Sequence, residues 1–152
     1  MNIKIDKIVS EVKEIISKSI DIDSILEEIS KKLKEMVFHY DWVGFYILDE
    51  EKKGLILGPY SGAQTEHEFI PIGKGVCGVV AQLQKTMVVQ DVSKMENYLS
   101  CSINVQSEIV VPILKNGKFI AELDIDSHSP APFTIMDTIL LEKICKELAK
   151  IF

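Results

Sequence analysis

Hydrophobic residues return every three or four positions at both ends of the chain, which is the spacing of a buried helix face. This spacing predicts helices at residues 5–20, 23–38 and 134–152, and Asp23 or Ser24 can cap the start of the second. The first helix can pack on the domain or on another subunit. The last helix follows a Ser-Pro-Ala-Pro breaker and is expected to close the fold.

Between these helices the chain consists of short β-branched and aromatic runs separated by turn residues, which is the pattern of strands. Six strands are expected, at residues 42–48, 55–60, 68–72, 86–90, 107–114 and 118–125. A polar turn ending at Gly54 predicts one hairpin, and Asn116-Gly117 predicts another because both residues tolerate the positive φ of a type I′ turn. A short helix is expected at 77–83, and an excursion with one or two helical turns at 91–106. Helices at both ends of a mainly antiparallel sheet predict an α+β fold.

The composition is that of one compact domain over residues 1–152, because 152 residues with 47% hydrophobic content can bury one substantial core. The net charge of -6 and the pI of about 5.1 argue against the basic surface that nucleic acids require. The sequence has neither an apolar run near the ~20 residues that span a bilayer nor a signal-peptide pattern. We therefore expect a cytoplasmic protein without nucleic-acid or membrane partners.

A glycine-rich segment at residues 73–78 matches the G-x-G-x-x-G pattern of dinucleotide-binding sites. The surrounding pattern does not support that function, because the preceding strands form an antiparallel hairpin, Pro71 interrupts the last of them and no βαβ units follow. The segment is better interpreted as a tight turn that lets backbone amides approach a ligand or another strand.

The three cysteines have different surroundings. Cys77 is expected in the first turn of the short helix, where unpaired amides favour a thiolate and lower its pKa, although a packed side chain explains it equally well. Cys101 lies between two serines in the polar excursion, which is unusual for a packing cysteine, whereas Cys145 lies among aliphatic residues of the last helix and is expected to be structural. No metal site is expected, because the sequence has no C-x-x-C motif and its histidines are scattered, at positions 39, 67 and 128.

Three acidic residues interrupt strands that otherwise consist of aliphatic residues: Glu108, Asp124 and Asp126. Period-two alternation puts both aspartates on one face. An ideal two-residue turn would pair Glu108 with Ile125, so Glu108 joins the aspartates only if a bulge shifts the register by one, which Pro112 makes credible. The cluster is then either a solvated strand end or a pocket for an ammonium group, with one carboxyl kept protonated as a general acid.

Trp42 and Tyr46 are four residues apart in a predicted strand, so their side chains share one side of the sheet. Core filling explains them as well as ligand contact does. An aromatic wall beside carboxylates would also suit a cation or a thioether.

Several segments are similar, in order and spacing, to one known family: WVGFY at 42–46, LGPYSG at 57–62, IPIGKGVCG at 70–78, SEIVVP at 107–112 and LDIDS at 123–127, together with Cys101. They resemble free methionine-R-sulfoxide reductases, which are built on the GAF fold. The resemblance implies a single GAF domain over residues 1–152, with Cys101 and Cys77 as the redox thiols. It also implies that five residues form the substrate pocket: Trp42, Tyr46, Glu108, Asp124 and Asp126.

The resemblance implies a mechanism in which free L-methionine-R-sulfoxide oxidises one thiol to a sulfenic acid and a Cys77–Cys101 disulfide follows. No bound cofactor is implied, since an external thiol reductant such as thioredoxin restores the thiols. The chain departs from the family at His67, where a third cysteine is common, and at Ser102, where an aspartate is common. Either Cys77 resolves alone, or an external thiol does, or efficient turnover has been lost.

Two other functions compete with the reductase. A GAF sensor module would bind a small molecule without chemistry and signal through its terminal helices, although no output domain is expected within these 152 residues. In a purely structural dimer unit, the carboxylates would form a solvent-exposed strand end. A homodimer, with the helix at residues 1–20 at its interface, is expected under all three interpretations.

Overall fold

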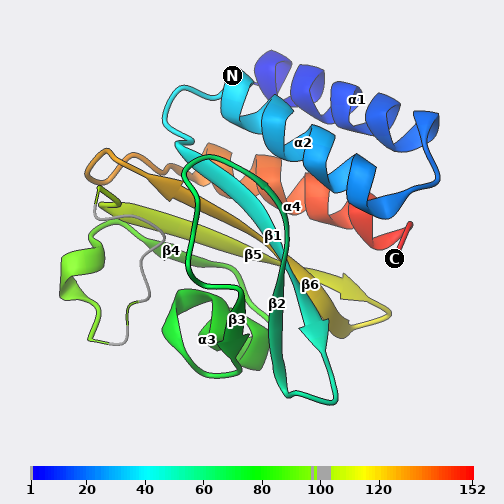
Figure 1. Cartoon of the computed structure of the whole chain (residues 1–152). Coiled ribbons are helices and arrows are strands. Elements are labelled where there is room, and N and C mark those ends of the chain that lie inside the picture. The colour runs from blue at the N-terminus through cyan, green and yellow to red at the C-terminus, as the bar shows by residue number, and fades with distance from the viewer. Residues whose placement is uncertain (1, 97, 99–103) are drawn as a thin grey trace.

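Six antiparallel strands form one curved sheet with helices on both faces (Figure 1). This computed structural model describes residues 2–96, 98 and 104–152, so Cys101 and Ser102 lie outside the described residues. In spatial order the strands are β3 (Phe69–Pro71), β2 (Gly54–Ser61), β1 (Trp42–Asp49), β6 (Lys118–Ser127), β5 (Ser107–Lys115) and β4 (Met87–Val89). The helices are α1 (Asn2–Lys18), α2 (Ile22–Met36), α3 (Gly75–Leu83), the short η1 (Val92–Lys94) and α4 (Ile135–Ala149). The predicted α+β class is therefore confirmed, with all six strands near their expected positions.

Helices α1, α2 and α4 lie together over one face of the sheet (Figure 1). Their apolar stripes and the inward residues of β1, β5 and β6 form the larger hydrophobic core, in which Leu26, Phe45 and Leu141 are fully buried. The apolar face of α1, including Ile8 and Val12, is buried in this core within the same chain. Any contact of α1 with a second subunit would therefore use its other faces.

Side-chain caps define where two of these helices begin. Helix α2 begins after Asp21, whose carboxylate accepts a hydrogen bond from the Ser24 backbone amide at 3.2 Å. The expectation that Asp23 or Ser24 is the cap was therefore wrong, because the cap is Asp21, two residues before Asp23. Helix α4 begins after Thr134 with a capping box, in which Asp137 accepts a hydrogen bond from the Thr134 amide at 2.8 Å.

The β5–β6 hairpin contains the register shift on which the carboxylate prediction depended. Its turn is at Asn116-Gly117, with both residues at positive φ, as predicted. A bulge between Ile113 and Leu114 then moves the pairing by one residue, so that Glu108 pairs with Asp126 instead of Ile125. Glu108 therefore lies on the same face of the sheet as the two aspartates.

Helix α3 and a second, smaller apolar cluster cover the opposite face of the sheet (Figure 1). The glycine-rich segment before α3 forms a tight turn, with Gly73 and Gly75 at φ of 87° and 60°. A Cβ at Gly78 would come within 2.6 Å of the Pro71 carbonyl oxygen, so this glycine allows the close packing of α3 on β3. Among the described residues no helix has the length and apolar character needed to cross a bilayer.

Candidate active site

The central strand β6 presents three acidic side chains toward α3. Glu122, Asp124 and Asp126 alternate with Leu123 and Ile125, which point into the larger core. All three acidic side chains are buried, with at most 1% of their surface exposed. A solvated strand end would expose such residues, so the first interpretation of the acidic cluster is wrong.

The neighbouring strands complete this acidic face. Strand β1 pairs Trp42 with Asp126 and Tyr46 with Glu122, so both aromatic side chains lie on the same side, as their spacing predicted. Strand β5 adds Glu108, which is 3% exposed. Gly44 lies opposite Asp124, and a Cβ at this position would come within 2.4 Å of the Trp42 ring.

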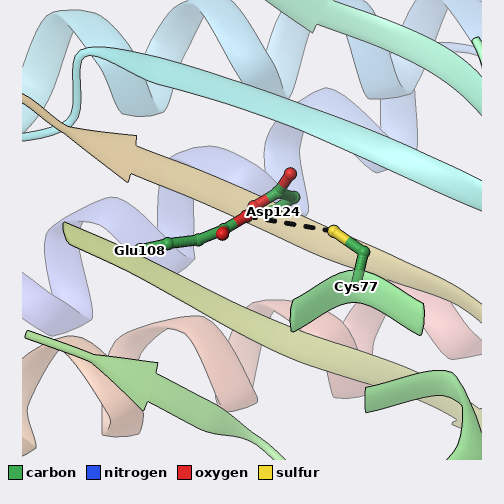
Figure 2. Close-up of side chains that lie close together, drawn as sticks. All are labelled: Cys77, Glu108 and Asp124. Atoms are coloured by element: carbon green, nitrogen blue, oxygen red, sulfur yellow. Dashed lines mark hydrogen bonds between the residues drawn. The ribbon is translucent and has the colours of Figure 1, made fainter. Parts of the chain in front are cut away.

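Helix α3 brings a thiol to the carboxylates. The Cys77 side chain points at Glu108 and Asp124 (Figure 2), and its Sγ lies 3.9 Å from Glu108 Oε2. The potential ligand atoms of these three residues all lie within 4.8 Å of one another. Sequence spacing argued against a metal site, yet the fold gathers one sulfur and two carboxylate donors from three separate elements.

A small cavity lies between these groups. Its volume of about 10 Å³ is enough for one water molecule. Its described lining residues are Tyr46, His67, Ile70, Lys74, Gly75, Val76, Cys77, Glu108 and Asp124. A ligand of amino-acid size would have to displace some of these side chains to enter.

Burial controls the protonation of the site. It raises the pKa of the Cys77 thiol well above the ordinary value, and the nearby carboxylates of Asp124 and Glu122 raise it further. The expectation that the start of α3 lowers this pKa was wrong: Cys77 does lie in the first turn, but desolvation and negative neighbours dominate there. Burial also raises the pKa of Glu122 and of Asp124, although the Cys77 thiol opposes the shift in both. The site therefore favours neutral thiol and carboxyl groups.

Comparison with known proteins places this arrangement in a family. A model of the GAF domain matches residues 21–152. The free methionine-R-sulfoxide reductase of Saccharomyces cerevisiae is 39% identical over 119 residues, which cover 77% of this chain and 66% of the yeast protein. The enzyme of the same name from Escherichia coli K12 is 32% identical over 126 residues, covering 83% of this chain and 74% of that protein. The chain belongs to the free methionine-R-sulfoxide reductases, a GAF-domain family of oxidoreductases.

A solved structure agrees with this assignment over almost the whole fold. The free methionine-R-sulfoxide reductase from Neisseria meningitidis, determined in complex with its substrate, has a TM-score of 0.93 and 33% identity. The similarity covers 97% of this chain and 87% of that one. The expected GAF fold and the expected family of reductases are both confirmed.

The structure gathers only part of the reductase site expected from the sequence into the cavity. Tyr46, Cys77, Glu108 and Asp124 line it. Asp126 and Trp42 lie on the same face of the sheet, outside the cavity lining, and Cys101 lies outside the described residues.

The two predicted aromatic residues also anchor the loop at residues 62–68. Trp42 stacks on Tyr60 with ring centroids 5.2 Å apart, and its Nε1 donates a hydrogen bond to the Ala63 carbonyl at 3.0 Å. The Tyr46 hydroxyl donates a hydrogen bond to the His67 carbonyl at 2.9 Å. His67, which occupies the position of the additional family cysteine, is thereby held at the cavity wall.

Glu122 is an acidic residue of this site that the sequence analysis missed. It lies on the same face as Asp124, and its negative charge raises the pKa of the Cys77 thiol. The signal was present in the sequence, because positions 122, 124 and 126 have the same period as the two aspartates. Cys145, in contrast, packs in the core on the other side of the sheet, as expected.

Proposed function

We propose that this chain reduces the R-sulfoxide of free methionine, with Cys101 as the nucleophile and Cys77 as the resolving thiol. Proteins named free methionine-R-sulfoxide reductase are similar to it over most of its length. The observation that supports the proposal most directly is the Cys77 thiol, 3.9 Å from Glu108 in a buried acidic cavity. Such a site combines a redox-active group with proton donors, and sulfoxide reduction needs both.

The carboxylate face is well suited to a free amino acid. In the proposed complex, Glu108, Asp124 and Asp126 bind the substrate ammonium group, and the aromatic rings of Trp42 and Tyr46 contact its sulfur-bearing chain. An ammonium group also offsets the repulsion between carboxylates that burial has brought together. A methionine residue within a peptide lacks this ammonium group, which explains why a free amino acid would be selected.

The first step transfers one oxygen atom. A neutral carboxyl group donates a proton to the sulfoxide oxygen while the Cys101 thiolate attacks the sulfoxide sulfur. The sulfur–oxygen bond of the substrate then breaks, methionine leaves, and Cys101 holds the oxygen as a sulfenic acid. The sulfoxide sulfur is reduced by two electrons and the cysteine sulfur is oxidised by two.

The second step forms the disulfide. Cys77 attacks the sulfenic acid sulfur, the hydroxyl group leaves, and the thiol proton combines with it as water. Because burial raises the pKa of Cys77, this step needs a base, and the Glu108 carboxylate is within 3.9 Å. An external dithiol such as thioredoxin then reduces the disulfide by exchange, without a bound cofactor. With histidine at position 67, Cys77 is proposed to resolve without a third cysteine.

Epimer-resolved turnover tests the proposal. Methionine formation is measured from free L-methionine-R-sulfoxide and from the S epimer, with dithiothreitol and separately with thioredoxin. The expected result is turnover of the R epimer alone, abolished in Cys101→Ser and retained in Cys145→Ser. Wild-type activity in Cys101→Ser would contradict the assigned nucleophile. Tight binding of the sulfoxide without any product would support a sensor module instead.

A trapping experiment separates the two thiol roles. In Cys77→Ser, one equivalent of methionine should form and the sulfenic acid should persist, so that dimedone labels Cys101. The wild-type protein should instead form the Cys77–Cys101 disulfide and resist dimedone. Dimedone labelling of both proteins to the same extent would exclude Cys77 as the resolving thiol.

We further propose that the protein is a cytoplasmic homodimer. The reducing cytosol suits a thiol enzyme, and the apolar face of α1 is already buried against its own chain, so the dimer would form through other surfaces. Light scattering on the purified protein measures the mass directly. A mass near 17.1 kDa at working concentrations would contradict the dimer.

A further inference from the structure

The cluster of Cys77, Glu108 and Asp124 has the composition of a metal site as well as that of a redox site. All three side chains are buried, and their potential ligand atoms lie within 4.8 Å of one another (Figure 2). Zinc accepts both thiolate sulfur and carboxylate oxygen, in tetrahedral geometry. Glu108 and Asp124 come from adjacent strands and Cys77 from a helix packed over them, so the ligands approach from more than one side.

Two buried acidic side chains of the site have oxygen atoms without a hydrogen-bond partner among the described residues. The Oδ1 atom of Asp124 is buried at the cavity and has no hydrogen-bond partner among the described residues. Both carboxylate oxygens of the adjacent Glu122 are also buried without such a partner. Neither residue forms an ion pair within the described part of the chain. Buried acceptors of this kind are normally satisfied, and a bound cation would satisfy several at once.

The dimensions also fit one ion. In a tetrahedral zinc site the metal–sulfur distance is about 2.3 Å and the metal–oxygen distance about 2.0–2.2 Å, so neighbouring ligand atoms lie about 3.3–3.6 Å apart. The Cys77 sulfur is already 3.9 Å from Glu108 Oε2. Small side-chain shifts would bring all three donors to bonding distance, and the cavity of about 10 Å³ has room for one particle the size of a water molecule or a metal ion.

We propose that the reduced protein binds one divalent zinc-type cation through the Cys77 sulfur and the carboxylates of Glu108 and Asp124. Binding forms the metal–sulfur bond and releases the thiol proton to solvent, with no change in oxidation state. The metal would hold Cys77 as a thiolate and occupy carboxylates that the substrate ammonium group would otherwise contact. The bound cation therefore excludes substrate and protects the thiol from oxidation. The site itself is inferred from geometry and does not depend on the proposed reductase activity.

Cobalt(II) tests the site without any assay of turnover. The full-length reduced protein is titrated with Co²⁺, and thiolate coordination is followed by the sulfur-to-cobalt charge-transfer absorption in the near ultraviolet. We expect saturation at one equivalent, loss of the band in Cys77→Ser, and displacement of Co²⁺ by Zn²⁺. The matched variant Cys145→Ser, which changes a thiol in the core on the other face of the sheet, should keep the band.

The carboxylate ligands are tested in the same titration. Glu108→Gln and Asp124→Asn should each weaken Co²⁺ binding at least about tenfold, the minimum effect of removing groups that support a metal site. Circular dichroism of each variant verifies that it folds. The proposal is overturned if folded wild-type protein shows no saturable charge-transfer band, or if the band survives in Cys77→Ser. Because no sulfoxide is present, these outcomes are independent of whether the chain is a reductase.

Discussion

Replacing Glu122 with leucine should stabilise the protein. The Glu122 side chain is 0% exposed, and both of its oxygens are buried without a hydrogen-bond partner among the described residues. A buried polar group left unsatisfied costs about 1–3 kcal/mol, and an apolar side chain of similar volume does not incur this cost. We expect a gain of about 2 kcal/mol in the free energy of unfolding for Glu122→Leu. In a domain of this size that corresponds to a rise of about 4–8 °C in Tm.

The gain should depend on pH, with a definite sign. Burial raises the pKa of Glu122 well above its ordinary value, so the folded protein keeps a proton that the unfolded chain releases. The stability of the wild-type protein therefore falls as pH rises from the unfolded Glu pKa, about 4.3, toward the folded pKa. The advantage of Glu122→Leu should be smallest at the acidic end of this window and increase with pH.

Urea-induced unfolding at about pH 5 and about pH 8 measures both effects. Fluorescence of the single tryptophan, Trp42, which is buried on the same sheet face, reports the transition. Glu28→Leu, an exposed helical position, is the matched control and should change stability by less than about 0.5 kcal/mol. A Glu122→Leu protein less stable than wild type at both pH values would refute the reasoning, as would a gain that does not change with pH.

Three further predictions concern packing, capping and thiol reactivity. Gly44→Ala should lower stability by about 1–3 kcal/mol in thermal unfolding, because its Cβ would lie 2.4 Å from the Trp42 ring; unchanged Tm would contradict this contact. Asp137→Ala should lower the free energy of unfolding by about 2–4 kcal/mol, since it removes the capping box with Thr134 and two further side-chain hydrogen bonds. A loss below about 0.5 kcal/mol, the level of a surface substitution, would contradict this prediction. Iodoacetamide should alkylate Cys77 in the native protein far more slowly than it alkylates a free thiol at the same pH, because burial raises the pKa of Cys77. The rates are measured by labelling followed by mass spectrometry, and equal rates would contradict this prediction.

The sequence predicted the elements well because most of them depend on local patterns. Helices and strands follow from apolar spacing, and the hairpin turn follows from the backbone preferences of Asn116 and Gly117. The exact start of α2 was missed because Asp21, Asp23 and Ser24 are all chemically able to cap, and only the folded backbone selects one of them.

The protonation of the site could not be read from the sequence. The position of Cys77 in the first turn of α3 was correct, but its pKa is determined by burial and by carboxylates on β5 and β6, which are distant in the chain. Glu122 was missed for a related reason. A single acidic residue within a strand pattern resembles an exposed one until the packing of α3 shows that it is covered.

The bulge in the β5–β6 hairpin connects the local sequence pattern of the strands with the burial of residues distant in the chain. Its presence decides which face Glu108 occupies, because a shift of one residue moves a strand side chain to the other side of the sheet. With the ideal register, Glu108 would enter the large apolar core beside Ile125, where a carboxylate has no partner. The observed register instead places it across from Asp126 and next to the Cys77 thiol. The cost of burying Glu108 in the apolar core therefore selects the bulged register, and the same register assembles the candidate site.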